Sequence, residues 1–101
     1  VYIYKRTSSA WAQEAYIKAA NSESMDEFGR TVSVSGNTLV VGSPGEDSDQ
    51  TTITNGATAS ANNDNNESGA AYVYKRTGSV WTQEAYIKSE LNTYSEYFGG
   101  S

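Results

Sequence analysis

A nearly identical segment occurs twice in this chain, and no other feature limits its possible folds as strongly. The sequence YIYKRTSSAWAQEAYIK begins at Tyr2, and YVYKRTGSVWTQEAYIK begins at Tyr72, seventy positions later. Thirteen of these seventeen positions are identical. The match fades after Lys18 and returns where Phe28-Gly29 aligns with Phe98-Gly99. Self-similarity at a fixed period indicates a tandem repeat, so the 101 residues hold about 1.4 units.

Short runs of alternating apolar and polar residues predict strands, and helical periodicity is nearly absent. We expect strands over residues 1–6, 11–18, 30–35, 38–42, 70–76 and 81–88. Gly36 and Asn37 tolerate positive φ and predict a tight reversal. Residues 21–27 are expected to form one helical turn or a loop. Residues 46–69 contain almost no large apolar side chain and are expected to form a long loop.

Four antiparallel strands in each period are typical of a β-propeller blade. Leucine-rich and ankyrin arrays have shorter periods with helical segments, and a tandem sandwich domain needs about seven strands. We therefore expect an all-β fold of four-stranded antiparallel blades, with about 1.4 repeats of a 70-residue unit. The expected parts are the outer two strands of a preceding blade (1–20), an inter-blade connection with Phe-Gly (21–29), one complete blade with the long loop 46–69 (30–89) and the start of the next blade (90–101).

Two short motifs resemble those of a known family. Phe28-Gly29 comes before the expected innermost strand, and Gly42-Ser43-Pro44 follows the next strand. In this order and spacing the chain resembles the FG-GAP repeat of integrin α-chain propellers and of many bacterial and archaeal surface proteins. The flanking TLVVGSPGEDS and AAYVYKRTGSVWTQEAYIK are similar to the long bacterial version of that repeat.

The chain departs from the family pattern at two places. The second motif reads Gly-Ser-Pro, where the family has Gly-Ala-Pro. Integrin-type repeats often bind calcium through a D-x-D-x-D-G loop between the first and second strands. Here the short turn from Ser35 to Asn37 takes that place, so that calcium site cannot be carried over.

The motif residues also have physical roles that do not depend on the family. Gly29 and Gly42 allow strands to turn or to approach each other without a Cβ, and Pro44 ends a strand by removing an amide donor. Phe28 and the two tryptophans are expected to fill the space between neighbouring blades, with exposed sugar-stacking platforms as the alternative. The residues expected to have structural roles in the repeat are Trp11, Phe28, Gly29, Gly42, Ser43, Pro44, Trp81, Phe98 and Gly99.

The composition excludes several classes of chemistry. The chain has no histidine and no cysteine, which removes the usual serine triad, disulfides and thiolate zinc sites. Its formal net charge of -5 argues against nucleic acid and anionic membranes as partners, and no apolar run is long enough for membrane insertion. Paired carboxylates can hydrolyse glycosides, but Glu14 and Glu84 recur as matching strand positions and are expected to face solvent. We expect no enzymatic activity.

The long loop is the candidate cation site. Residues 46–69 include five acidic residues and five asparagines, and Ca²⁺ prefers such oxygen ligands. The candidate ligands are Asp47, Asp49 and Asp64. The alternative is a solvated polar loop whose Asn and Asp side chains stabilise turns.

The sequence thus favours an extracellular or cell-surface propeller module that acts in binding, in adhesion or as a scaffold. Ser, Thr and Asn make up 32 residues, against seven Lys and Arg, which is typical of secreted proteins. The alternatives are a structural repeat of a surface fibre or stalk and a carbohydrate-binding propeller. The expected partners are neighbouring repeats, together with a surface protein or a glycan. We also expect the chain to be part of a longer array, with neighbouring units covering the apolar faces around Val32, Val34, Leu39, Val41, Val73 and Tyr74.

Overall fold

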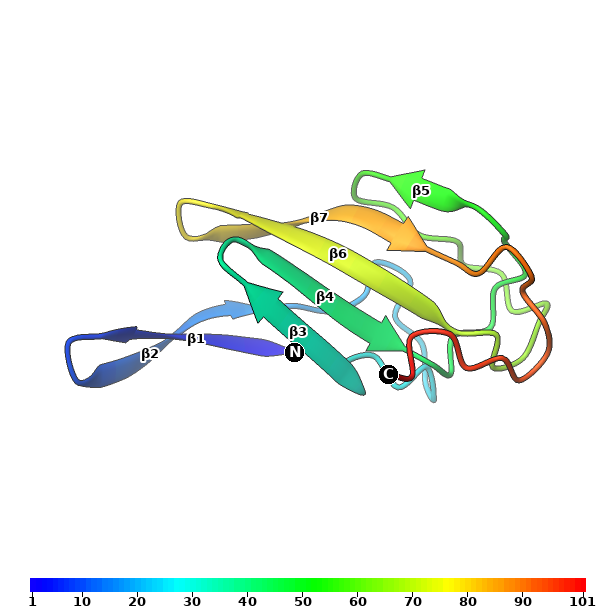
Figure 1. Ribbon diagram of the computed structural model, residues 1–101, viewed down its shortest axis with the longest axis horizontal. Coiled ribbons are helices and arrows are strands. Elements are labelled where there is room, and N and C mark those ends of the chain that lie inside the picture. The colour runs from blue at the N-terminus through cyan, green and yellow to red at the C-terminus, as the bar shows by residue number, and fades with distance from the viewer.

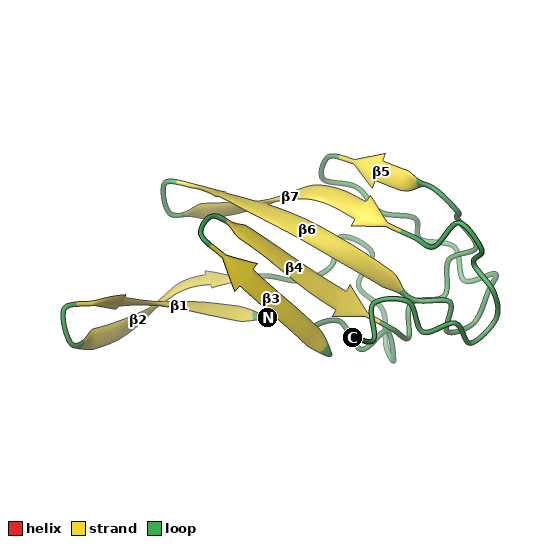
Figure 2. Ribbon diagram, in the orientation of Figure 1, coloured by secondary structure: helices red, strands yellow, loops and turns green.

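The computed structural model describes all 101 residues as two antiparallel β-sheets without a helix (Figures 1 and 2). β1 (Tyr2–Thr7) and β2 (Ala10–Tyr16) form a two-stranded sheet, called here the first hairpin. The larger sheet has the strand order β3-β4-β6-β7-β5. Its strands are β3 (Thr31–Ser35), β4 (Thr38–Ser43), β5 (Ile53–Asn55), β6 (Ala70–Thr77) and β7 (Val80–Ile87). The prediction of an all-β antiparallel fold is confirmed.

The larger sheet has five strands, whereas the sequence predicted four. The additional strand, β5, lies within the stretch that was expected to be a loop, and it pairs with the outer edge of β7. Ile53 pairs with Ile87 and Thr54 pairs with Tyr86, and the open edge of β7 allows these β-branched residues to pair as a short strand. Residues 21–27 form turns and a loop, and no helix. None of the segments forms a helix with the length and apolar character that a membrane crossing requires.

The two copies of the repeated segment adopt the same structure. In the first hairpin Tyr2 pairs with Tyr16, and in the second hairpin (β6–β7) Tyr72 pairs with Tyr86, each seventy residues later. Both hairpins shift register at the equivalent place, after Ile3 and after Val73. This β-bulge leaves one residue of the outer strand without a partner, Glu14 in one copy and Glu84 in the other.

The connections that follow the hairpins also match, although their sequences differ. Positive φ angles occur at residues 25, 27 and 29 in the first copy (75°, 57° and 93°) and at residues 95, 97 and 99 in the second (54°, 55° and 87°). Positive φ is uncommon outside glycine. The period of seventy therefore extends through the backbone to Gly99, including positions where no residue identity remains.

The first hairpin covers one face of the larger sheet and projects beyond the tips of its strands (Figure 1). The buried apolar side chains between the two sheets are Ile17, Ala19, Leu39, Val41, Ala70, Tyr72, Tyr74 and Tyr86, with Val1, Ile3 and Ala15 packed against them. On the same face, the β3 side chains Val32 and Val34 stay exposed. Leu39, Val41 and Tyr74 are therefore buried in a core to which the first hairpin contributes, and the sequence assigned this hairpin to the preceding unit. Cover of Val32, Val34 and Val73 by further units stays a prediction.

Candidate functional site

The Gly-Ser-Pro motif lies between the two Phe-Gly motifs at the end of β4. The Gly29 amide donates to the Gly42 carbonyl at 3.0 Å, and the Thr31 hydroxyl donates to the Gly99 carbonyl at 2.7 Å. A Cβ added to Gly42 would lie 2.0 Å from the Gly99 carbonyl oxygen. No side-chain rotation relieves this clash, because the oxygen belongs to the backbone and the position of a Cβ is fixed by the backbone of residue 42. Glycine is therefore required where successive Phe-Gly segments meet β4.

The middle residue of this motif explains the departure from Gly-Ala-Pro. The Ser43 hydroxyl is fully buried and donates to the Asp26 carbonyl at 2.7 Å. It therefore ties the first connection to β4 in a way that alanine cannot. Pro44 follows directly and is buried where the strand ends. The second connection, which contains Phe98 and Gly99, is tied to the segment before β6, because the Phe98 amide donates to the Ser68 carbonyl at 3.0 Å.

The aromatic residues of the motifs occupy different environments. Phe28 packs edge-on against Tyr72, with ring centroids 5.1 Å apart. Trp81 is partly buried against the core, whereas its equivalent Trp11 is 69% exposed. Within this chain the second tryptophan contacts a neighbouring hairpin and the first does not.

A groove of about 670 Å³ opens where the two connections and the long loop come together. Its lining residues are Met25, Glu27, Arg30, Pro44, Gly45, Asp47, Asn66, Glu67, Tyr94, Tyr97 and Gly100. Arg30 pairs with Glu27 at 3.0 Å, and the Tyr97 hydroxyl donates to Glu67 at 2.8 Å. That hydrogen bond raises the pKa of Tyr97. The groove is mixed in charge and is lined mainly by polar groups.

A buried ion pair fixes the long loop to the sheet behind this groove. Lys88 Nζ lies 2.6 Å from Glu46 Oε2, and the two side chains are 0% and 2% exposed. Lys88 also donates to the Ser68 hydroxyl at 2.8 Å, and Asn21 donates to the second oxygen of Glu46 at 3.1 Å. Since the Tyr72 hydroxyl donates to Asn21 at 2.6 Å, the network reaches the core.

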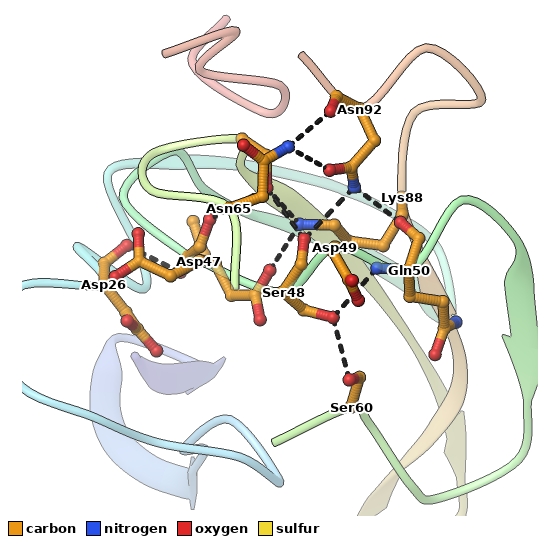
Figure 3. A network of polar contacts seen from close by, with 12 residues as sticks. Asp26, Asp47, Ser48, Asp49, Gln50, Ser60, Asn65, Lys88 and Asn92 are labelled. Carbon is orange, nitrogen blue, oxygen red and sulfur yellow. Dashed lines mark hydrogen bonds and ion pairs between the residues drawn. The ribbon is translucent and has the colours of Figure 1, made fainter. Parts of the chain in front are cut away.

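Further hydrogen bonds order the rest of the loop (Figure 3). The Asn92 side chain donates to the backbone carbonyls of Ser48 and Gln50, at 3.1 Å and 2.5 Å. Asn65 donates to Asn92, and the Ser48 hydroxyl donates to Ser60 at 2.7 Å. The loop is thus held mainly by polar side chains, which explains how it is ordered with so few apolar residues.

The two motifs and the strands around them match a known family. The sequence pattern of the FG-GAP repeat matches residues 11–74, which is more than half of the chain. The chain belongs to the FG-GAP repeat family. The matched stretch begins in β2, contains both motifs and ends in β6, so the family's unit runs from one hairpin into the next sheet. No match was found among curated proteins or among solved structures.

The three candidate calcium ligands of this FG-GAP repeat do not converge. Asp47 Oδ1 accepts the Glu67 amide at 2.6 Å. Asp49 and Asp64 are exposed, and their amides donate to the side-chain oxygen of Asn62 at 3.1 Å and 3.3 Å. No group of three acidic, histidine or cysteine side chains is positioned to hold a metal ion. Calcium binding by this loop stays a prediction.

Asp26 is the carboxylate most perturbed by its surroundings. It is 5% exposed and lies at the edge of the polar network. Burial raises its pKa to about 6, and the nearby carboxylates of Glu46 and Glu23 act in the same direction. Asp26 is therefore an unfavourable charge at neutral pH, held in place because its own carbonyl accepts from Ser43.

The sequence prediction for Glu14 is wrong. It was expected to face solvent, but its side chain is 9% exposed and accepts hydrogen bonds from Arg76 and Trp81 of the second hairpin. Sequence reasoning also missed the pairing of Lys88 with Glu46. The available signal was that four residue types of these contacts recur in both copies, at Glu14/Glu84, Arg6/Arg76, Trp11/Trp81 and Lys18/Lys88. Recurrence alone does not show which copy is buried.

Proposed function

We propose that this FG-GAP repeat is a non-catalytic unit of a β-propeller that acts outside the cell as a binding, adhesion or scaffold module. The observation that supports it most is the stacking of one repeat hairpin on its equivalent, seventy residues later, with the same register. In this proposal β3, β4, β6 and β7 are the four strands of one blade, and β5 is an addition at its outer edge. The first hairpin belongs to the preceding blade, so the chain holds about 1.4 repeats.

The two apolar faces of the larger sheet favour a radial array. One face is covered by the first hairpin. On the other face Val40 pairs with Val73 and Ile53 pairs with Ile87, and Val40 and Ile53 are exposed. A sheet with two apolar faces needs a neighbour on each side, and a propeller supplies both.

A binding role is supported by the residues that differ between the copies. Tyr94 stands where the first copy has Ser24, and Tyr97 stands where it has Glu27. Both tyrosines line the groove, on a backbone that matches the first connection. A constant scaffold that carries variable loop side chains is typical of binding modules.

The proposed location is tested on intact cells that produce the parent protein. Antibodies raised against this chain should label the cells without permeabilisation. Labelling that appears only after permeabilisation would contradict an extracellular role. The number of units in the parent protein separates the two architectures, because about four to eight copies close a ring and dozens favour a fibre or stalk.

Carbohydrate binding is the second candidate, and the exposed Tyr94 in the groove favours it. Tyrosine rings supply flat apolar surfaces for stacking, and the neighbouring Asn66 and Glu67 supply polar groups. A glycan array probed with the chain should give signals that fall in Tyr94→Ser, the residue of the first copy. Leu91→Ser is the matched control because Leu91 is exposed and lies outside the groove. Equal signals for both variants would reject a sugar site in the groove.

A further inference from the structure

The contact between the two hairpins is closed by a carboxylate that receives three donors. Arg76 donates to Glu14 through Nε at 3.1 Å and through Nη2 at 2.5 Å, and Trp81 Nε1 donates at 2.9 Å. These bonds, with Arg76 first, lower the pKa of Glu14 and keep it ionised. A two-pronged arginine contact to a shielded carboxylate is among the stronger and more directional interactions in proteins. We call Glu14, Arg76 and Trp81 the clasp.

The chain carries the three residue types of the clasp a second time, without using them. Arg6 and Trp11 are the equivalents of Arg76 and Trp81, and Glu84 is the equivalent of Glu14. All three are exposed, and neither charge takes part in a salt bridge. The donors stand on the first hairpin and the acceptor on the second, so they cannot meet within one molecule in the way that Glu14 meets Arg76.

The apolar faces around the clasp are duplicated in the same way. Tyr72, Tyr74 and Tyr86 are buried in one cluster with Ile17, which follows β2, and Ile3 and Ala15 of the first hairpin pack against this cluster. The equivalent tyrosines of the first hairpin form a bare face, with Tyr2 57%, Tyr4 56% and Tyr16 54% exposed. The equivalents of the covering residues are Val73, Ala85 and Ile87, and they lie half-buried on the second hairpin. The outer faces of the two hairpins thus present the two halves of the contact that the hairpins make with each other.

We infer that two copies of this chain associate head to tail through a second clasp. The second hairpin of one copy covers the tyrosine face of the other copy's first hairpin, and Glu84 accepts from Arg6 and Trp11 of that other copy. The surfaces are complementary in charge and in shape because they repeat a contact already formed within the chain. The two patches differ, so the association is heterologous and either propagates or closes into a ring. It does not depend on the extracellular role or on the ligand proposed above.

The test is sedimentation equilibrium of the 101-residue chain from micromolar to millimolar concentration, with charge-reversed variants. The wild type should gain mass with concentration. Glu84→Arg and Arg6→Glu should each weaken association about tenfold or more, because each places like charges at the contact. The double variant Glu84→Arg/Arg6→Glu should restore association to within about threefold of wild type. Glu90→Arg is the matched control because Glu90 is exposed on the same chain end.

Folding of each variant is checked by near-ultraviolet circular dichroism, since Glu14, Arg76 and Trp81 are unchanged in all of them. A wild type that stays monomeric at millimolar concentration would overturn the inference. So would association that responds equally to Glu84→Arg and to Glu90→Arg, since pairing through the open edge of β3 would behave in that way. A double variant that associates no better than the single variants would reject the pairing of Glu84 with Arg6.

Discussion

Replacing Lys88 by methionine removes one charge from the buried pair that ties the long loop to the end of β7. Methionine has nearly the volume of lysine, so the change isolates the charge. Glu46 then stays 2% exposed with Asn21 as its remaining side-chain donor. Breaking a buried ion pair by removing one partner costs about 3–5 kcal/mol, because the other charge is left without compensation. Domains of this size have a total stability of about 5–15 kcal/mol, so the loss is a large fraction.

Urea denaturation followed by tryptophan fluorescence measures this loss. With a slope of about 1.5 kcal/mol/M, the midpoint of Lys88→Met should fall by about 2–3 M. The repeat supplies the matched control, because Lys18 is the equivalent lysine and is exposed. Lys18→Met should change the stability by no more than about 0.5 kcal/mol.

Glu46→Gln completes a double-mutant cycle with Lys88→Met. The double variant should lose less than the sum of the two single losses, because no unpaired charge then remains in the interior. If Lys88→Met lowers the midpoint no more than Lys18→Met does, the pair does not hold the loop, and the reasoning is refuted.

Three further predictions concern the motifs and the carboxylates. Gly42→Ala should abolish cooperative unfolding, because its Cβ would lie 2.0 Å from the Gly99 carbonyl oxygen. Gly78→Ser should be tolerated, because Ser8 occupies the equivalent turn with φ 58°. Equal thermal melts for the two variants would contradict this prediction. Asp26→Asn should raise stability by about 1–2 kcal/mol near pH 7.5. The pKa of Asp26 is raised in the folded state to about 6, so protonated Asp26 favours the folded state; this stabilisation is fully present below the unfolded value near 3.8 and is lost as the pH rises through 6. The gain from Asp26→Asn should therefore disappear in urea melts near pH 4. A gain independent of pH would reject the assignment. The calcium hypothesis predicts heat on titration of the wild type with Ca²⁺ and none for Asp47→Ala/Asp64→Ala; absence of heat and of a thermal shift in the wild type would leave a solvated polar loop.

The repeat made most of the strand pattern predictable from the sequence. Once two segments of seventeen residues match at a distance of seventy, any pairing inside one copy is expected in the other. The bulges at Glu14 and Glu84 follow this rule. The two connections share a backbone even where their residues differ, so identity did not predict that match. β5 could not be foreseen in the same way, because a strand of three residues is defined by the edge it pairs with and hardly by its own sequence.

The repeat did not predict how the environments of equivalent side chains differ between the two copies. Lys18 and Lys88 have almost identical preceding residues, yet Lys18 is exposed and Lys88 is buried beside Glu46. Glu14 and Glu84 differ in the same way. Burial here depends on which neighbouring unit is present, and that information lies in tertiary contacts and is absent from the local sequence.

The two tryptophans offer the most direct measurement of the claim that successive units stack in one fixed relation. Each repeat hairpin carries one tryptophan, and the two occupy equivalent positions in it. Hydrogen exchange of their indole N–H groups, followed by NMR over a concentration series, reports the contact at each end. The Trp81 indole should be protected at every concentration because it donates to Glu14 at 2.9 Å. The Trp11 indole should exchange freely in dilute solution and gain protection as the concentration rises. Equal exchange of the two indoles at every concentration would contradict the stacking of one unit on the next.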